Sequence, residues 1–362
     1  NGTLSYTTVT TIRGYIRTAI EKMQQFNPNS NVDIGELYMA MAFVEMSLSE
    51  TYCSGIPLGK IDGPSPDYSD PAFKPLTNNE VYDAALIHVD SALTLVGNGT
   101  DAASVAVRSA SLITKARILI NKAQFTQAAA LVPTSAVPST FQYTWVTQTS
   151  SNNDDLGIWT VNNSVARLTV SDSFDIIGGQ VNQIRNALPF ASANDPRVPV
   201  VLNTTSPAED GTTPLYVQRI WPNRDDPIPM VSGIDARLIE AEARLNASDI
   251  AGMMTILNQL RADRPRIGNF QPAAMTPIAT VPATQAAAVT LFFREKGFWT
   301  FGRGQRLGDL RRLIRQYGRT EDNVFPKGNY LKGGVYGSDV NFPVADGELV
   351  NPQFHGCINR SA

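Results

Sequence analysis

Apolar residues recur every three or four positions along the first third of the chain. Ile12, Ile16 and Ile20 follow this spacing and predict an amphipathic helix over residues 8–26. The same pattern predicts further helices in this part of the chain, over residues 33–52, 78–96, 101–122 and 127–131. The stretch from Ala116 to Ala128 has small and aromatic residues at positions where antiparallel helices must approach closely, as in tetratricopeptide-like units. We therefore expect helix pairs that repeat without strict sequence identity.

A capping box marks the start of one of these helices. Thr77 and Glu80 stand three residues apart, so each side chain can bond the backbone amide of the other. A proline-rich loop, residues 53–76, precedes it. The loop separates the second predicted helix from the third.

The helical pattern stops at about residue 132 and returns at about residue 231. Pro, Ser, Thr and Asn dominate residues 132–230, which predicts a loop-rich, non-repetitive insertion. Helices are then predicted over residues 233–246, 248–262, 283–299 and 304–317. The fold class expected is mainly α. We expect one composite domain of four parts: helices in 1–131, the insertion in 132–230, helices that pack on the first part in 231–317, and a strap in 318–362.

Charge argues against a nucleic-acid partner. Charged residues make up 17% of the chain and the net charge is -3, with no dense lysine or arginine stripe. No apolar run reaches the roughly 18 residues that a membrane-spanning helix needs. The chain starts at Asn1 without a signal-like segment, so a targeting segment is either removed or was never present.

The sequence gives little support to catalysis, metal binding or a cofactor. The two histidines, His88 and His355, lie far apart, and two cysteines are too few for a zinc cage. The pairs Asp154-Asp155 and Asp225-Asp226 could supply the two carboxylates of a glycosidase, but adjacent aspartates in such loops more often form turns. We therefore expect no enzyme, no metal and no cofactor.

Charges gather in a C-terminal stretch that looks like an active site. Arg306 and Arg312 each lie three residues from Asp309, so one carboxylate can pair with both arginines on one helix face. This spacing predicts an ion-paired structural corner.

Aromatic residues are the main candidates for ligand binding. Their flat rings with a polar edge suit stacking on sugar rings, while neighbouring amide and guanidinium groups can bond hydroxyls. The candidate ligand-binding residues are Tyr68, Tyr143, Trp145, Trp159, Trp221, Asn223 and Arg224. The alternative is that these aromatic side chains anchor a loop-rich subdomain that has few aliphatic residues.

Cys53 and Cys357 lie in loop-like segments near opposite ends of the chain. Low charge and a polar surface suit an oxidising compartment, where exposed free thiols are avoided. We expect a disulfide that ties the C-terminal strap to the end of the second helix.

Four stretches carry motifs that occur together in one family. They are the helix from Glu36 that ends in Tyr52-Cys53-Ser54-Gly55-Ile56-Pro57-Leu58, the segment Asp195-Pro196-Arg197, the pair Ala241-Glu242-Ala243 and Leu257-Asn258-Gln259-Leu260-Arg261, and the series from Arg294-Glu295 through Gly308-Asp309-Leu310-Arg311-Arg312 to Asn351-Pro352. In this order they resemble the SusD/RagB family of surface-exposed nutrient-binding lipoproteins, in a short form.

The resemblance implies a core of tetratricopeptide-like helix pairs and a non-repetitive region that carries the ligand surface. It also implies capture of a glycan or another nutrient for a SusC-like TonB-dependent transporter, at the extracellular face of the outer membrane. Members of the family carry a lipidated N-terminal cysteine, which this chain lacks, so the anchor is trimmed away or absent. Membrane contact is expected only through such an anchor. Two alternatives stay open: a helical-repeat scaffold or self-assembling surface protein without a small ligand, and a glycoside hydrolase.

Overall fold

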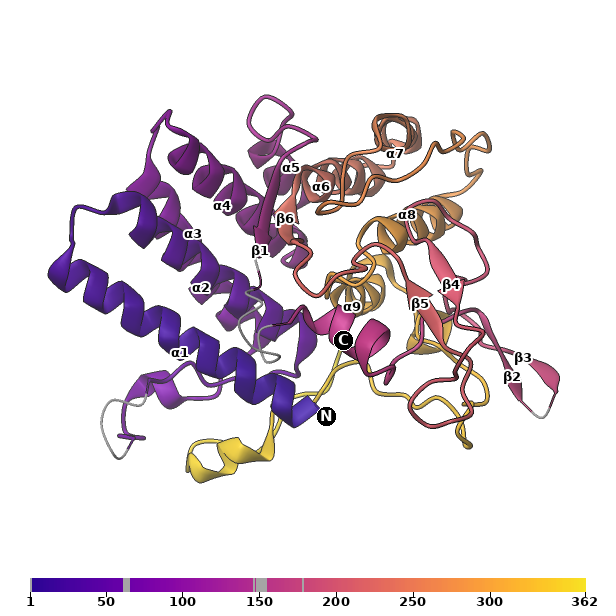
Figure 1. The fold of residues 1–362 in the computed structure, drawn as a ribbon. Helices are drawn as coiled ribbons and strands as arrows, with labels where there is room; N and C mark the ends of the chain where they lie inside the picture. Colours follow the sequence, from indigo (N-terminus) through magenta and orange to yellow (C-terminus); the bar gives the residue numbers. More distant parts are fainter. Residues whose placement is uncertain (1, 61–65, 146, 148–154, 178) are drawn as a thin grey trace. The chain divides into compact units, whose positions relative to one another are not determined.

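The computed structural model describes residues 2–60, 66–145, 147, 155–177 and 179–362 (Figure 1). These residues form two compact units. The first unit comprises Asn1–Val132 and Asp339–Ala362, and the second comprises Pro133–Ser338. The segment expected to form a strap, 318–362, is therefore divided between the units at Asp339.

The first unit is a row of antiparallel helices. Its elements are α1 (Gly2–Phe26), α2 (Asn31–Thr51), η1 (Pro71–Phe73), α3 (Asn78–Val96), α4 (Ala102–Asn121), α5 (Phe125–Leu131) and η5 (Asp346–Val350). In Figure 1 α1 to α4 lie side by side, and α2 packs against α1, α3 and α4. The mainly helical fold predicted for this part is confirmed, and Thr77 and Glu80 form the predicted capping box of α3.

Helix α1 begins six residues before the predicted start, at Gly2 instead of residue 8. Its first turns are rich in serine and threonine and show no apolar period. They are held instead by Tyr6, which is buried and packs edge-to-face on Tyr52 with ring centroids 5.0 Å apart. A single buried ring thus replaces the apolar stripe that a sequence pattern detects.

The predicted disulfide is present and joins residues 304 positions apart. Cys53 bonds Cys357, with the two Cα atoms 5.8 Å apart. The backbone amide of Cys53 donates to the carbonyl of Phe342 at 2.8 Å, and that of Ile358 donates to Ser54 at 2.8 Å. The C-terminal segment is therefore fixed to the end of α2 by one covalent bond and by backbone hydrogen bonds.

We predict that the double substitution Cys53→Ser and Cys357→Ser lowers the free energy of unfolding by about 2–5 kcal/mol, because the bridge closes a long loop in the unfolded chain. Denaturant titration of the variant and of the parent protein measures the difference. Equal transition midpoints would contradict the prediction.

The second unit combines helices with short strands. Its elements are β1 (Gln142–Trp145), η3 (Trp159–Ser164), β2 (Phe174–Ile177), β3 (Gln180–Gln183), β4 (Val200–Leu202), β5 (Tyr216–Gln218), β6 (Ile228–Ser232), α6 (Gly233–Asn246), α7 (Ile250–Asp263), α8 (Gln285–Trp299), α9 (Arg306–Tyr317) and η4 (Glu321–Asn323). The strands pair as β1–β6, β2–β3 and β4–β5, each pair antiparallel. The insertion therefore contains β-hairpins and ladders where only loops were expected.

A buried carboxylate ties this insertion to the helices. Glu295 of α8 accepts hydrogen bonds from Arg197 Nη1 at 2.7 Å and from Arg261 Nη2 of α7 at 2.6 Å. Arg197 also donates from Nε to Asp195 at 2.8 Å. Arg197 and Glu295 are both fully buried. Burial alone would raise the pKa of Glu295, but Arg261 and Arg197 outweigh it and hold the pKa below its usual value.

A second network fixes the predicted ion-paired corner. Asp309 accepts from Arg312 at 2.8 Å, as expected, and from Lys296 at 2.6 Å. Arg312 also pairs with Glu242 of α6. The expected hydrogen bond between Arg306 and Asp309 does not form, because Arg306 reaches back to the carbonyl of Phe293 at 3.4 Å and Lys296 takes its place.

We predict that Glu295→Ala lowers the free energy of unfolding by about 3–5 kcal/mol, because it leaves Arg197 charged and buried without its main partner. Glu209→Ala is the matched control, since Glu209 pairs with Arg167 at the surface with side chains 54% and 63% exposed. The control should change stability by less than about 1 kcal/mol. Similar losses in both variants, measured by denaturant titration, would contradict the role assigned to Glu295.

Across the part of the chain that the structure describes, no helix combines the length and apolar character needed to cross a membrane.

Candidate functional site

Two of the predicted aromatic residues of the second unit, Trp145 and Trp159, keep part of their surface exposed. Trp145 ends β1 opposite Ile228 of β6 and is 45% exposed. Trp159 begins η3, a π-helical turn, and its Nε1 donates to the carbonyl of Pro222 at 3.0 Å. Trp159 is thus held beside the loop 221–226, and both rings keep exposed surface.

The polar residues of that loop have structural partners. The amide nitrogen of Asn223 donates to Asp226 Oδ2 at 2.7 Å, and its side chain donates to Asp226 Oδ1 at 3.3 Å. Arg224 pairs with Asp155 at 2.6 Å. Asp226 therefore stabilises a turn and Asp155 holds the Arg224 side chain, while Asp154 lies outside the described residues. A ligand would meet Asn223 and Arg224 as groups already held in place.

Trp221 is not a stacking platform. Its side chain is fully buried, and a Cβ added at Gly302 would lie 2.7 Å from its Cζ3 atom. The prediction of a ligand-facing ring is wrong for Trp221. Its ring packs into space left by the missing side chains of Gly302 and Gly268, which are far away in the sequence. Trp221 anchors the subdomain, as the structural alternative proposed.

The remaining two candidates lie elsewhere. Tyr143 is half-buried in β1 opposite Val231. Tyr68 belongs to the first unit, where its ring packs edge-to-face on Phe73 with centroids 5.1 Å apart.

A cavity of about 280 Å³ in the second unit brings together residues that the sequence did not single out as a site. We call it the tyrosine cavity. Three tyrosine rings, one phenylalanine ring and three aspartates line it: Tyr216, Tyr330, Tyr336, Phe174, Asp172, Asp175 and Asp210. The β2–β3 hairpin, strand β5 and a hairpin near residue 332 supply these walls.

The hairpin that carries Tyr330 and Tyr336 is built on glycine. Asn329 bridges Val335, and the amide of Tyr330 donates to the carbonyl of Gly334 at 3.0 Å. Gly333 and Gly334 have φ angles of 98° and 76°, which residues with a side chain rarely adopt. The tight turn places the two tyrosine rings edge-to-face with centroids 5.5 Å apart.

The polar groups of the tyrosine cavity are open to a ligand. Within the described chain, the hydroxyls of Tyr216, Tyr330 and Tyr336 form no hydrogen bond, and the Asp175 carboxylate accepts none. Asp172, in contrast, accepts from Ser192 Oγ at 2.8 Å. Aromatic faces and unused hydrogen-bonding groups therefore converge on one space, as in sites for small polar ligands.

The charged residues of the cavity are three aspartates and two basic side chains: Asp172, Asp175, Asp210, Arg167 and Lys332. Burial and the nearby Asp172 carboxylate raise the pKa of Asp175. Burial, Asp175 and Tyr330 raise the pKa of Tyr336. Lys332 pairs with Asp210 across the rim, and its hydrogen bond lowers the pKa of Asp210. The cavity thus offers hydroxyl donors and a carboxylate acceptor, without an unpaired cationic group among these residues.

The described residues contain no group of three or more His, Cys, Asp or Glu side chains that could hold a metal ion.

Comparison with solved structures identifies the fold. A SusD superfamily protein from Bacteroides vulgatus matches 98% of this chain and 83% of its own, at 17% identity and a TM-score of 0.59. The chain has the SusD-like fold. The resemblance predicted from the four motifs is thereby confirmed at the level of the fold, although no protein-family model and no curated protein sequence matches.

Two further SusD-like structures are described by their ligands. A SusD-like carbohydrate binding protein from Bacteroides vulgatus shares 14% identity, with 97% of this chain and 83% of that chain covered and a TM-score of 0.58. Surface glycan-binding protein A from Bacteroides uniformis shares 14% identity, with 98% and 84% covered and a TM-score of 0.57.

We predict that Asp175→Asn stabilises the protein at pH 7. A raised pKa means that the folded state disfavours the ionised carboxylate, so Asp175 costs stability at neutral pH and this cost disappears as the pH falls through its folded pKa. Thermal unfolding should show a higher midpoint for the variant at pH 7 and a smaller difference at pH 3. A lower midpoint at pH 7 would contradict this assignment.

Proposed function

We propose that this protein is a non-enzymatic, cell-surface glycan-binding protein. The observation that carries the proposal is the tyrosine cavity, with three tyrosine rings, their unused hydroxyls and Asp175, in a chain of SusD-like fold. Solved structures of that fold include a carbohydrate binding protein and a surface glycan-binding protein. Tyrosine faces stack on the apolar faces of sugar rings, and the hydroxyl and carboxylate groups bond sugar hydroxyls.

In this proposal the tyrosine cavity is the principal sugar site. Tyr336 and Tyr330 meet at a T-shaped angle of 73°, so one ring can stack on a sugar while the edge of the other borders it. Asp175 accepts hydroxyl hydrogens without losing an existing hydrogen bond. Trp145 and Trp159 with Asn223 and Arg224 then form a second surface for a longer oligosaccharide. Tyr143 and Tyr68 remain untested candidates.

The protein would work at the extracellular face of the outer membrane and deliver its ligand to a SusC-like TonB-dependent transporter. The SusD-like fold supports this arrangement by resemblance. A lipid anchor would hold the protein at the membrane.

We predict that Tyr336→Ala weakens oligosaccharide binding by at least about tenfold, because it removes a stacking ring and its hydroxyl. A panel of neutral oligosaccharides is first screened by thermal shift, since a ligand that binds the folded state raises the midpoint. Calorimetry with the best ligand then compares the variant with the parent protein. Tyr336→Phe should lose less affinity than Tyr336→Ala.

Tyr15→Ala is the control, because Tyr15 is 72% exposed on α1 of the first unit. The double substitution Trp145→Ala and Trp159→Ala distinguishes the two surfaces. If this variant loses affinity while Tyr336→Ala binds normally, the sugar site lies at Trp145 and Trp159 and not in the tyrosine cavity. No saturable ligand in the panel would argue against glycan capture by the isolated protein.

A further inference from the structure

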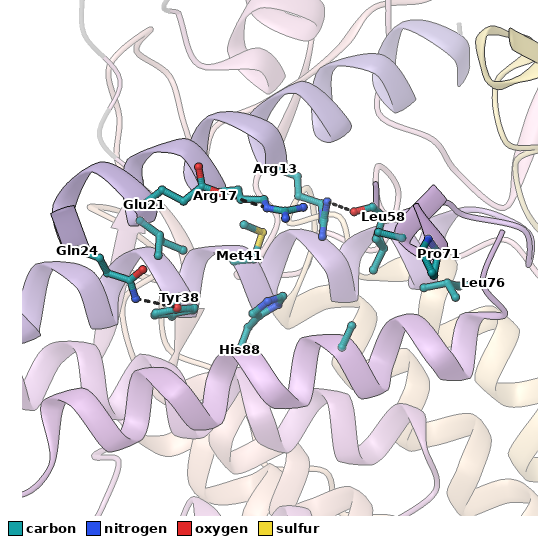
Figure 2. Close-up of a pocket in the computed structure, with 13 residues that line it drawn as sticks. Arg13, Arg17, Glu21, Gln24, Tyr38, Met41, Leu58, Pro71, Leu76 and His88 are labelled. Atoms are coloured by element: carbon teal, nitrogen blue, oxygen red, sulfur yellow. Dashed lines mark hydrogen bonds and ion pairs between the residues drawn. The ribbon is translucent and has the colours of Figure 1, made fainter. Parts of the chain in front are cut away.

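A second cavity, of about 450 Å³, lies wholly within the first unit (Figure 2). Helices α1, α2 and α3 and the chain between α2 and α3 surround it. Most of its wall is apolar, from Ile20, Met41, Leu58, Pro71, Ala72, Leu76 and Ala84. Its polar lining comes from Arg13, Arg17, Glu21, Gln24, Tyr38 and His88. An apolar pocket with a few convergent polar groups is the usual form of a small-molecule site.

One buried carboxylate orients two of the polar groups. Glu45 of α2 is fully buried. Its Oε1 accepts from Arg13 Nε at 2.9 Å, and its Oε2 lies 2.7 Å from His88 Nδ1. Arg13 Nη1 donates to the carbonyl of Leu58 at 2.8 Å. Because a carboxylate accepts, Nδ1 of His88 carries a proton, and Nε2 is the nitrogen left for another partner.

Two nitrogen atoms remain unused at this end of the cavity. Among the residues that the structure describes, Arg13 Nη2 and His88 Nε2 have no hydrogen-bond partner. Figure 2 shows the Arg13 side chain extending from α1 and the His88 ring extending from α3 toward the space between these helices. The ring of Tyr38 stacks beside His88, with centroids 6.0 Å apart and planes at 25°. Both residues are therefore held in place before any ligand arrives.

The sign of the available charge favours an anion. Both oxygens of Glu45 are occupied. Among the described residues that line the cavity, Glu21 is the only acid, and it pairs with Lys60 at 2.5 Å and with Arg17 at 3.5 Å. The Arg17–Glu21 pair has side chains 38% and 43% exposed, so a ligand can recruit Arg17 at little cost. A carboxylate can accept from Arg13 Nη2 and, in the imidazolium form of His88, also from Nε2, whereas a cation would find no unpaired acid among the described lining residues.

We propose that this cavity binds a small carboxylate that has an aliphatic body. The carboxylate lies between Arg13 and His88, and the aliphatic body packs on Ile20, Met41 and Leu58. This site lies in a different unit from the tyrosine cavity and takes a different chemical class of ligand. A failure of glycan binding would therefore leave the proposed carboxylate site unaffected.

The test uses the two histidines of the chain as reporters. In the full chain, imidazole proton resonances are followed by NMR during titration with N-acetyl-leucine and, separately, with N-acetyl-leucinamide, its neutral analogue. We expect N-acetyl-leucine to shift the His88 resonance saturably and to leave the exposed His355 unchanged. The amide should bind about tenfold more weakly or worse, since it lacks the charge-assisted hydrogen bonds.

His88→Asn tests the orientation directly. The asparagine amide can replace Nδ1 as the donor to Glu45, but it removes Nε2 from the cavity. We expect the affinity for N-acetyl-leucine, measured by calorimetry, to fall about tenfold, and His355→Asn to leave it unchanged. Arg17→Gln, which removes a charge near the surface of α1, should weaken binding as well.

Three results would each overturn the proposal: equal binding of the acid and the amide, a His88 shift no larger than that of His355, or full affinity in His88→Asn. If His88→Asn does not fold, two other measurements test the proposal. They are the comparison of acid with amide on the parent protein and the affinity of the Arg17→Gln variant. Glucuronate and acetate extend the probe set. The claim that the ligand has an aliphatic body would be wrong if glucuronate bound more tightly than N-acetyl-leucine. It would also be wrong if acetate bound as tightly as N-acetyl-leucine.

Discussion

The second unit depends on the carboxylate of Glu295. Its two oxygens receive Arg197 from the insertion and Arg261 from α7, so three segments far apart in the sequence meet on one side chain of α8. Removing such a pair partner from a buried site is costly, whereas the intact network is about neutral in stability. The main effect of the network is therefore on where the insertion attaches to the helices. The short strands of the insertion have few apolar contacts of their own, so these ion pairs determine its position.

Most of the motifs that carry the resemblance to the SusD/RagB family supply residues of these ion-pair networks. Asp195 and Arg197 belong to one motif, Arg261 to another and Glu295 to a third. Arg197 bonds both Asp195 and Glu295, and Arg261 bonds Glu295. Glu242 likewise meets Arg312. The sequence motifs therefore identify residues that stabilise the fold. The sequence says much less about the proposed ligand sites, because their side chains come from segments far apart along the chain.

The helices could be predicted because each buries a stripe of residues close together in sequence. The capping box at Thr77 and the disulfide at Cys53 also follow from residue types whose chemistry has few uses. The strands could not be predicted, since each is only three to five residues long and β6 contains Pro229. The tyrosine cavity escaped for a different reason. Its walls come from segments near residues 172, 216 and 333, and no local pattern links them.

Burial of charge also explains what the surface offers to a ligand. Only 17% of the residues are charged, and the fully or nearly buried ones include Glu45, Arg197, Glu242, Glu295 and Arg312. The surface is left poorer in charge than the composition suggests, so long-range electrostatic attraction contributes little to ligand capture. Recognition must then rely on short-range contacts: ring faces, hydroxyls and preoriented nitrogen or oxygen atoms. The tyrosine cavity and the cavity beside Glu45 both meet this requirement, because in each the polar atoms that face a ligand belong to side chains that the fold already holds.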